Sequence, residues 1–336
     1  MKSVNIITEL QYSDALSKLI SGDLVTDYCH FCVNSSEDKV WDYVVVFESL
    51  SEKCNFKCRK GGLVYITGEP DSIKKYYDQF LNQFDVIITS QKSIKQKVNR
   101  LVIVEQILPP LFGYNILKKD YHWSYEDMRR FPYPNKMKDI SVIVSNKMMT
   151  KGHFIRYNLV SSLMKEFPNK IDFWGSGVGN PSVDKADAIL PYKFHICIEN
   201  SMNDYYWTEK IMDPYIGYSI PIYAGCPNIE KYFPMQSYYS IDVFNLNSVK
   251  STIANILSKS DVFYKDRFPY LLMAREKLLS TYSFSKRISD IICKIDVLIK
   301  TRDVMVYNIK PENCFMNFRF HNFLWNVKQM IGYGKK

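Results

Sequence analysis

The first third of the chain alternates short apolar runs with polar or amphipathic segments. Runs rich in β-branched residues predict strands at residues 4–10, 41–49, 61–70, 85–90 and 100–108, and apolar residues at helical spacing predict a helix at 72–84. Strands that alternate with helices are typical of a parallel sheet with both faces covered. This part therefore reads as an α/β domain.

A second alternating series begins near residue 139. It predicts strands at 139–145, 170–175, 194–199 and 219–225, and helices at 155–167, 208–218, 246–259 and within 266–300. The intervening stretch, 108–135, is rich in proline and aromatic residues and lacks a period, which indicates a linker. We expect two Rossmann-like domains with parallel sheets that face across a cleft. They span residues 1–135, linker included, and 136–300, and a separate tail covers 301–336.

Composition narrows the class of protein. Hydrophobic residues make up 46% of the 336 residues and charged residues 24%, which permits a sizeable core. The net charge of +9 suits an anionic ligand or surface. No signal peptide is expected, and the most apolar long window, 98–117, contains Arg100, Glu105 and two prolines. We expect a cytoplasmic protein that is soluble or peripherally bound to a membrane.

Eight cysteines in so long a chain do not indicate a disulfide framework, and buried thiols favour a reducing compartment. Two close pairs, Cys29 with Cys32 and Cys54 with Cys58, imitate a four-thiolate zinc site. The intervening run 41–50 reads as a strand that would separate the pairs. Loop thiols are the favoured interpretation, with zinc as the alternative.

The glycines Gly175, Gly177 and Gly179 imitate a dinucleotide-binding loop. However, Asn180 replaces the third glycine of that fingerprint and Pro181 follows, so no helix opens there. A loop is the better interpretation, which removes the main argument for a nicotinamide-dependent dehydrogenase.

The segment Thr208-Glu209-Lys210 opens a predicted helix. Thr208 can cap the helix and Glu209 favours its positive end, so capping alone would explain both. Lys210 opposes the helix dipole, but it is suited to a diphosphate bound at the helix N-terminus. Arg156 could add a second cation, or it could be an ordinary solvated arginine.

From Ser141 to Pro234 the chain closely resembles the α1,3/4-fucosyltransferases of glycosyltransferase family 10. The matching motifs, in order, are Ser145-Asn146, Ile155-Arg156, Tyr192-Lys193-Phe194, Glu199-Asn200, Tyr206-Trp207-Thr208-Glu209-Lys210, Pro221 with Tyr223 and Gly225, and Pro227-Asn228-Ile229. Two positions depart from the family pattern. Ile198 stands where the family usually has Phe, and Trp207 where it usually has Val.

The resemblance implies a GT-B fold with an N-terminal acceptor domain, a C-terminal GDP-sugar domain and inversion at the anomeric carbon. It implies that Arg156 and Lys210 hold the diphosphate and that Glu209 binds hydroxyls of the nucleotide sugar. The other residues expected to line the donor site are Ser145, Asn146, Asn200 and Tyr206.

Inversion requires a general base for the acceptor hydroxyl. Gly68-Glu69-Pro70 resembles the family segment that carries the proposed base, so Glu69 is the expected catalytic residue, with an exposed turn carboxylate as the plain alternative. Glu48, at the end of another predicted strand, is the reserve candidate. The sequence contains no Asp-x-Asp motif, so we expect no essential metal. We also expect no cofactor, with GDP-fucose as the donor substrate.

The tail at 301–336 has six Lys or Arg against two acids, a net charge of +4, and seven aromatic residues. Phe320, Leu324, Val327 and Ile331 would share one face of a helix, which could lie on an anionic membrane or pack onto the domain. Nucleic acid is not an expected partner, since no binding module accompanies the charge.

These observations predict an inverting enzyme that transfers L-fucose from GDP-β-L-fucose to a glycan or lipid-linked oligosaccharide. An α1,3 linkage to a GlcNAc-type residue is expected. The alternatives are the same scaffold with another GDP-sugar and a nucleotide-sugar-binding module without turnover.

Overall fold

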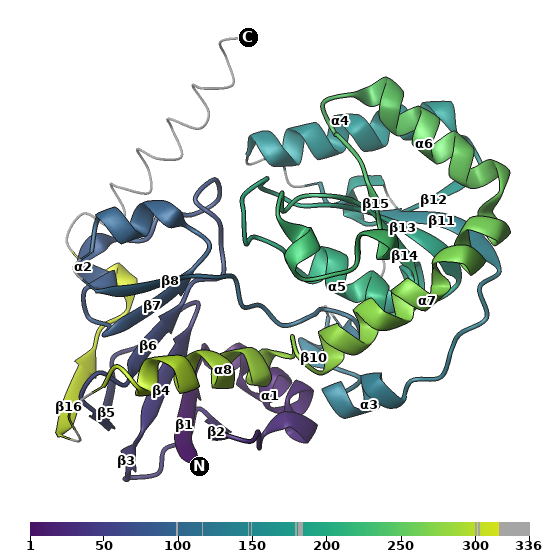
Figure 1. Ribbon diagram of the computed structural model, residues 1–336. Coiled ribbons are helices and arrows are strands. Elements are labelled where there is room, and N and C mark those ends of the chain that lie inside the picture. Colours follow the sequence, from purple (N-terminus) through teal and green to yellow (C-terminus); the bar gives the residue numbers. More distant parts are fainter. Residues whose placement is uncertain are drawn as a thin grey trace, which may run out of the picture. The chain divides into compact units, whose positions relative to one another are not determined.

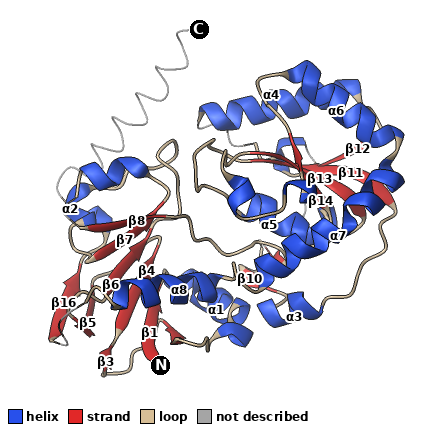
Figure 2. Ribbon diagram, in the orientation of Figure 1, coloured by secondary structure: helices blue, strands red, loops and turns tan. Residues whose placement is uncertain are grey.

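Two compact units make up the chain. The computed structural model describes residues 1–98, 100–115, 117–146, 148, 150–178, 180, 184–299, 301 and 303–315. Unit 1 comprises Met1–Ile107, Lys119–Glu126 and Phe284–Lys336, and unit 2 comprises Leu108–Lys118 and Asp127–Ser283. Each is an α/β unit built on a parallel sheet, as predicted (Figures 1 and 2).

The main sheet of unit 1 is parallel, in the order β2-β1-β4-β6-β7-β8. Its strands are β1 (Lys2–Ile7), β2 (Cys29–Val33), β4 (Tyr43–Phe47), β6 (Leu63–Ile66), β7 (Val86–Thr89) and β8 (Leu101–Val104). Every residue of β4 is buried, which is typical of a central strand covered on both faces. Because the strands run in one direction, Glu48 after β4 and Glu69 after β6 lie at the same edge.

The helices of unit 1 include α1 (Leu10–Leu19), α2 (Asp78–Leu81) and α8 (Phe284–Asp296). Helix α8 is amphipathic, and its buried apolar residues are Phe284, Ile288, Ile291, Ile292 and Ile295. The Asp296 carboxylate accepts hydrogen bonds from the hydroxyls of Tyr43 at 2.7 Å and Tyr28 at 2.8 Å. These contacts fix α8 to the N-terminal sheet, so the predicted domain of residues 136–300 extends too far at its C-terminal end.

A second sheet in unit 1 has the order β16-β5-β3. Strand β16 (Val304–Ile309) pairs antiparallel with β5 (Cys54–Arg59), and β5 pairs with β3 (Val40–Trp41). The predicted separate tail is therefore wrong for these residues: they complete a sheet, and the Tyr307 hydroxyl donates to Asp85 at 2.6 Å. The predicted amphipathic face of Phe320, Leu324, Val327 and Ile331 lies outside the described residues, so membrane contact through 301–336 stays a prediction.

Unit 2 has a parallel sheet in the order β12-β11-β13-β14-β15. The strands are β11 (Lys138–Ile143), β12 (Ile171–Trp174), β13 (Tyr192–Ile198), β14 (Ile220–Ala224) and β15 (Tyr239–Ser240). The helices are α4 (Lys151–Glu166), α5 (Glu209–Ile216), α6 (Leu246–Ser258) and α7 (Ser260–Leu279). Most were predicted within a few residues, but α7 begins six residues before the predicted segment 266–300, and β15 is too short to show a period.

Two local predictions were wrong. The linker 108–135 contains β9 (Tyr114–Asn115), β10 (Asp120–Tyr121) and α3 (Tyr125–Arg130), and its residues are divided between the units. The helix predicted at 72–84 is reduced to α2, because the chain before it is held by a tertiary contact. The Tyr76 side chain is buried, and its hydroxyl accepts hydrogen bonds from the backbone N–H groups of Gly68 and Glu69 at 3.2 and 3.1 Å.

The two cysteine pairs lie on strands rather than in loops. Cys29 and Cys32 belong to β2, and Cys54 and Cys58 belong to β5. Residues three apart on a strand point to opposite faces, so Cys29 and Cys32 do not converge. Among the described residues, no group of three or more His, Cys, Asp or Glu is arranged to hold a metal ion. In the same residues, no helix is long and apolar enough to span a membrane.

Candidate functional site

Polar side chains of unit 2 meet at the carboxyl edge of its parallel sheet, which is where open α/β sheets bind ligands. Ser145 and Asn146 follow β11, and Glu199 and Asn200 follow β13. Helix α4 approaches this edge very closely at Gly152. A Cβ at that position would overlap the backbone carbonyl of Asn200, so only glycine fits without displacement.

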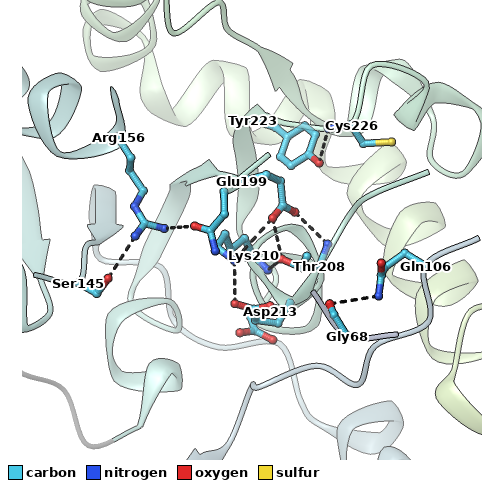
Figure 3. A network of polar contacts seen from close by, with 12 residues as sticks. Gly68, Gln106, Ser145, Arg156, Glu199, Thr208, Lys210, Asp213, Tyr223 and Cys226 are labelled. Atoms are coloured by element: carbon cyan, nitrogen blue, oxygen red, sulfur yellow. Dashed lines mark hydrogen bonds and ion pairs between the residues drawn. The ribbon is translucent and has the colours of Figure 1, made fainter. Parts of the chain in front are cut away.

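Arg156, on α4, extends a cation to this edge (Figure 3). Its guanidinium donates to Asn200 Oδ1 at 2.9 Å and to Ser145 Oγ at 3.1 Å. The side chain is only 7% exposed, and burial lowers the pKa of Arg156 despite the nearby Glu209 and Glu199. Its Nε has no hydrogen-bond partner, and within the described part of the chain Arg156 forms no ion pair. A fixed, buried positive charge held by neutral groups is suited to an anion.

Helix α5 begins beside a buried carboxylate. The Glu199 side chain is fully buried and accepts hydrogen bonds from the Thr208 N–H at 2.9 Å and the Thr208 hydroxyl at 2.7 Å. Thr208 in turn caps the helix by accepting from the Lys210 N–H at 3.3 Å. Burial raises the pKa of Glu199, while the Lys210 ammonium at 3.6 Å opposes the shift. Glu199 thus fixes the residues that open α5.

Lys210 and Glu209 are paired at the start of α5. The Lys210 Nζ lies 3.0 Å from Glu209 Oε1. Burial raises the pKa of Glu209, but the ammonium groups of Lys210 and Lys185 outweigh it and hold that pKa below its ordinary value. Burial lowers the pKa of Lys210, yet the carboxylates of Glu209 and Glu199 raise it above its ordinary value. Both groups are therefore charged at neutral pH.

The other predicted donor residues lie in different surroundings. Tyr206 is 2% exposed and close enough to Arg156 to affect its pKa. Asn146 is exposed, and it exchanges two hydrogen bonds with the Ser176 hydroxyl, at 3.3 and 3.4 Å. The structure joins Arg156 directly to Ser145 and Asn200, and places Asn146 at the rim of that cluster.

Two residues of the cluster were missed by sequence reasoning. Lys185, in the short helix η4 (Lys185–Ala188), lies 3.4 Å from Glu209 Oε1 and 3.3 Å from Asp213 Oδ2. Asp213 is 1% exposed and lies one turn after Glu209 on α5. Their position i and i+4 on one helix is the signal that could have marked Asp213 as part of this face.

In unit 1, Glu69 is exposed at the end of β6, in a turn whose backbone is held tightly. The Gln91 amide donates to the Glu69 carbonyl at 2.8 Å, and the Gln106 amide donates to the Thr67 and Gly68 carbonyls at 2.9 and 3.4 Å. Gln106 and Gly68 are drawn in Figure 3. The buried glutamines that fix this turn were not predicted.

Glu48 lies beside that turn. It is half-buried, with a φ of 63°, in the left-handed region that non-glycine residues rarely adopt. A Cβ at Gly68 would overlap the Glu48 carboxylate, so a larger residue there would displace that side chain from its present position. The two candidate bases therefore follow the paired strands β4 and β6; the sequence placed each after a strand but did not predict that these strands are neighbours.

The fold is shared with a known enzyme structure. A crystal structure of an alpha1,3-fucosyltransferase with GDP superposes with a TM-score of 0.54 at 19% identity, covering 90% of this chain and 91% of that chain. That similarity, with two α/β units on parallel sheets, identifies the GT-B fold that was predicted.

Sequence relatives match shorter segments. The alpha-(1,3)-fucosyltransferase FucT of Helicobacter pylori is 39% identical over 61 residues, 18% of this chain and 13% of that protein. The bovine 4-galactosyl-N-acetylglucosaminide 3-alpha-L-fucosyltransferase 9 is 28% identical over 142 residues, 41% of this chain and 38% of that protein. The chain thus matches less than two fifths of the length of either relative.

A family-level match covers more of the chain. Residues 133–306, which are 174 of the 336 residues, match the family described as glycosyltransferase family 10 (fucosyltransferase) C-term. This stretch includes Ser145, Arg156, Asn200, Glu209 and Lys210. The chain therefore belongs to glycosyltransferase family 10, the fucosyltransferase family.

Proposed function

We propose that the protein transfers L-fucose from GDP-β-L-fucose to a hydroxyl of a glycan acceptor, with inversion and an α1,3-type linkage to a GlcNAc-type residue. The observation that carries this proposal is Arg156. Its buried guanidinium is held by the neutral side chains of Ser145 and Asn200 and keeps an unpartnered Nε. Such a group gains most from an anionic ligand, and a diphosphate supplies one.

The start of α5 supports the same ligand. Helix N–H groups and Lys210 add positive potential beside Arg156. In the proposed reaction these cations stabilise the charge that develops on the β-phosphate as the bond between the sugar C1 and the phosphate oxygen breaks. Glu209, fixed and ionised, accepts hydrogen bonds from hydroxyls of the nucleotide sugar, and Asn200, Tyr206, Ser145 and Asn146 line the donor site.

Unit 1 supplies the base in this proposal. Glu69 takes the proton of the acceptor hydroxyl while the acceptor oxygen forms its bond to C1, and the electron pair of the broken bond leaves with GDP. The hydrogen bonds of Tyr76 and Gln91 to the Glu69 backbone fix the position of the backbone from which the carboxylate extends. Glu48 is the alternative base.

No metal is needed for this scheme. Arg156 and Lys210 occupy the role that a divalent ion plays beside a nucleotide-sugar diphosphate, and the sequence lacks the Asp-x-Asp carboxylates that commonly bind such an ion. We also propose that the acceptor is a glycan or lipid-linked oligosaccharide reached from the cytoplasmic side, with membrane contact through 301–336.

A donor panel tests the proposal. The protein is incubated with GDP-fucose, GDP-mannose, UDP-GlcNAc and UDP-galactose, with and without a GlcNAc-containing acceptor, and nucleotide release and heat of binding are measured. We expect binding of GDP-fucose and acceptor-dependent release of GDP. Turnover of GDP-mannose alone would support the same scaffold with another sugar. Binding without turnover for every acceptor tried would support a non-catalytic module, and no binding of any GDP-sugar would refute the donor site.

A further inference from the structure

One lysine of unit 2 bridges two carboxylates on the same face of α5. Lys185 Nζ lies 3.4 Å from Glu209 Oε1 and 3.3 Å from Asp213 Oδ2. The two carboxylates are four residues apart, so they lie one above the other on the helix. The Lys185 side chain is 20% exposed and that of Asp213 only 2%. This pairing therefore forms in the interior, where charge pairs are weakly screened.

Asp213 is itself fixed by the backbone. Its Oδ1 accepts a hydrogen bond from the Leu111 N–H at 2.8 Å, and among the described residues its Oδ2 forms an ion pair with the Lys185 ammonium but no hydrogen bond. Because the backbone holds the Asp213 carboxylate in place, that carboxylate fixes the position of the Lys185 ammonium. The chain of contacts then runs from the Leu111 backbone through Asp213 and Lys185 to Glu209.

At its other end this chain meets Lys210. Glu209 Oε1 lies between two ammonium groups, Lys185 at 3.4 Å and Lys210 at 3.0 Å. Lys210 is anchored separately by Thr208, at 3.2 Å, and by Glu199, at 3.6 Å. Figure 3 shows Glu199, Thr208, Lys210 and Asp213 gathered at the start of α5. With one oxygen held from two sides, the Glu209 carboxylate has a single preferred orientation.

We propose that Lys185, anchored by Asp213, is a positioning residue that orients Glu209 for the hydroxyls of the nucleotide sugar. The inference rests on the proposed function, because it assigns Glu209 to the donor. Lys185 acts through Glu209 and not as a ligand of the diphosphate, which the proposed function assigns to Lys210 and Arg156. A pre-oriented carboxylate loses less freedom on binding, and this loss is one of the main costs of recognition.

A double-mutant cycle tests this inference. Donor affinity is measured by calorimetry with GDP-fucose for the wild type, Lys185→Met, Glu209→Gln and the double variant. Methionine keeps the length and apolar stem of lysine. We expect Lys185→Met to weaken binding about tenfold to a hundredfold, the range seen when residues that orient metal ligands are replaced. If Lys185 acts through Glu209, the double variant binds within about twofold of Glu209→Gln alone.

Two further variants separate positioning from general support of the fold. Lys185→Arg keeps a cation between the carboxylates and should bind within about threefold of the wild type, and Asp213→Asn should weaken binding in the same direction as Lys185→Met. If Lys185→Met fails to fold, the cycle is run with Asp213→Asn in its place. The matched control is Lys250→Met, which breaks the exposed 2.8 Å ion pair with Glu166 on other helices of the same unit and should leave affinity unchanged.

The outcomes are distinct. Losses that multiply in the double variant would overturn the positioning role while leaving the donor site intact. An equal loss of affinity for inorganic pyrophosphate and for GDP-fucose in Lys185→Met would identify Lys185 as a phosphate ligand and also overturn it. A wild type that binds no GDP-fucose would refute the proposed function, and the inference with it.

Discussion

Replacement of Arg156 by methionine should separate ligand affinity from stability. The guanidinium is 7% exposed, and its two hydrogen bonds go to the neutral groups Asn200 Oδ1 and Ser145 Oγ. Loss of a charged partner of a buried anion costs about 2–5 kcal/mol, which raises the GDP dissociation constant about 30-fold to several thousandfold. Arg156→Lys keeps the charge but cannot contact Ser145 and Asn200 together, so an intermediate loss is expected.

The stability of the Arg156→Met variant without ligand should not decrease along with its GDP affinity. Burial lowers the pKa of Arg156, so in the absence of ligand its surroundings disfavour the charge. Methionine fills most of the same volume without that cost, and the melting temperature of Arg156→Met should equal or exceed that of the wild type. Calorimetry with GDP measures the dissociation constant, and thermal unfolding without GDP measures the melting temperature. Arg130→Ala serves as the surface control. Unchanged GDP affinity in a folded Arg156→Met variant would refute the assignment of this arginine to the diphosphate.

Three further predictions follow from other parts of the structure. Glu69→Gln should leave GDP-fucose affinity and melting temperature nearly unchanged while the transfer rate falls by about 10²–10⁴; full activity in Glu69→Gln with loss in Glu48→Gln would transfer the role of base to Glu48. Transfer measured in EDTA should stay close to that of the untreated protein, and complete loss restored by Mn²⁺ would contradict a metal-independent scheme. Burial raises the pKa of Asp213 from 3.8 to about 7, so the folded state binds this proton more tightly than the unfolded state does. The free energy of unfolding should therefore decrease as the pH rises from 3.8 to about 7, by at most about 4 kcal/mol. Asp213→Asn should remove that slope in urea unfolding at pH 5 and pH 8, and an unchanged slope would show that other groups cause it.

The sheet of unit 2 and most residues of its candidate donor site could be predicted because their signals are local. Consecutive residues are enough to locate the strand that ends at Glu199-Asn200 and the helix that begins at Thr208-Glu209-Lys210. The rule that parallel strands share a carboxyl edge then brings Ser145 and Asn200 together, and Arg156 joins them.

Other features depend on tertiary contacts that no local pattern encodes. Helix α8 follows unit 2 in sequence but packs on the sheet of unit 1, through contacts such as those of Asp296 with Tyr28 and Tyr43, which join residues far apart in the sequence. Tyr76 has the spacing of a helical residue, yet its hydroxyl is drawn to the backbone of the Glu69 turn. Lys185 lies in a segment before β13 that shows no hydrophobic period. Asp213 looks in the sequence like any acidic residue of a helix.

The charges around α5 also explain why Arg156 should matter more to GDP than Lys210 does. The described cluster contains three cations, Arg156, Lys185 and Lys210, and three carboxylates, Glu199, Glu209 and Asp213. Both lysines lie within 4 Å of two carboxylates each, whereas Arg156 contacts neutral oxygens alone. A diphosphate at Lys210 must share that ammonium with carboxylates. At Arg156 it would pair with a buried charge that no described carboxylate contacts directly. Arg156→Met should therefore reduce GDP affinity more than Lys210→Met does, and equal losses measured by calorimetry would mean that the carboxylates do not weaken the contribution of Lys210.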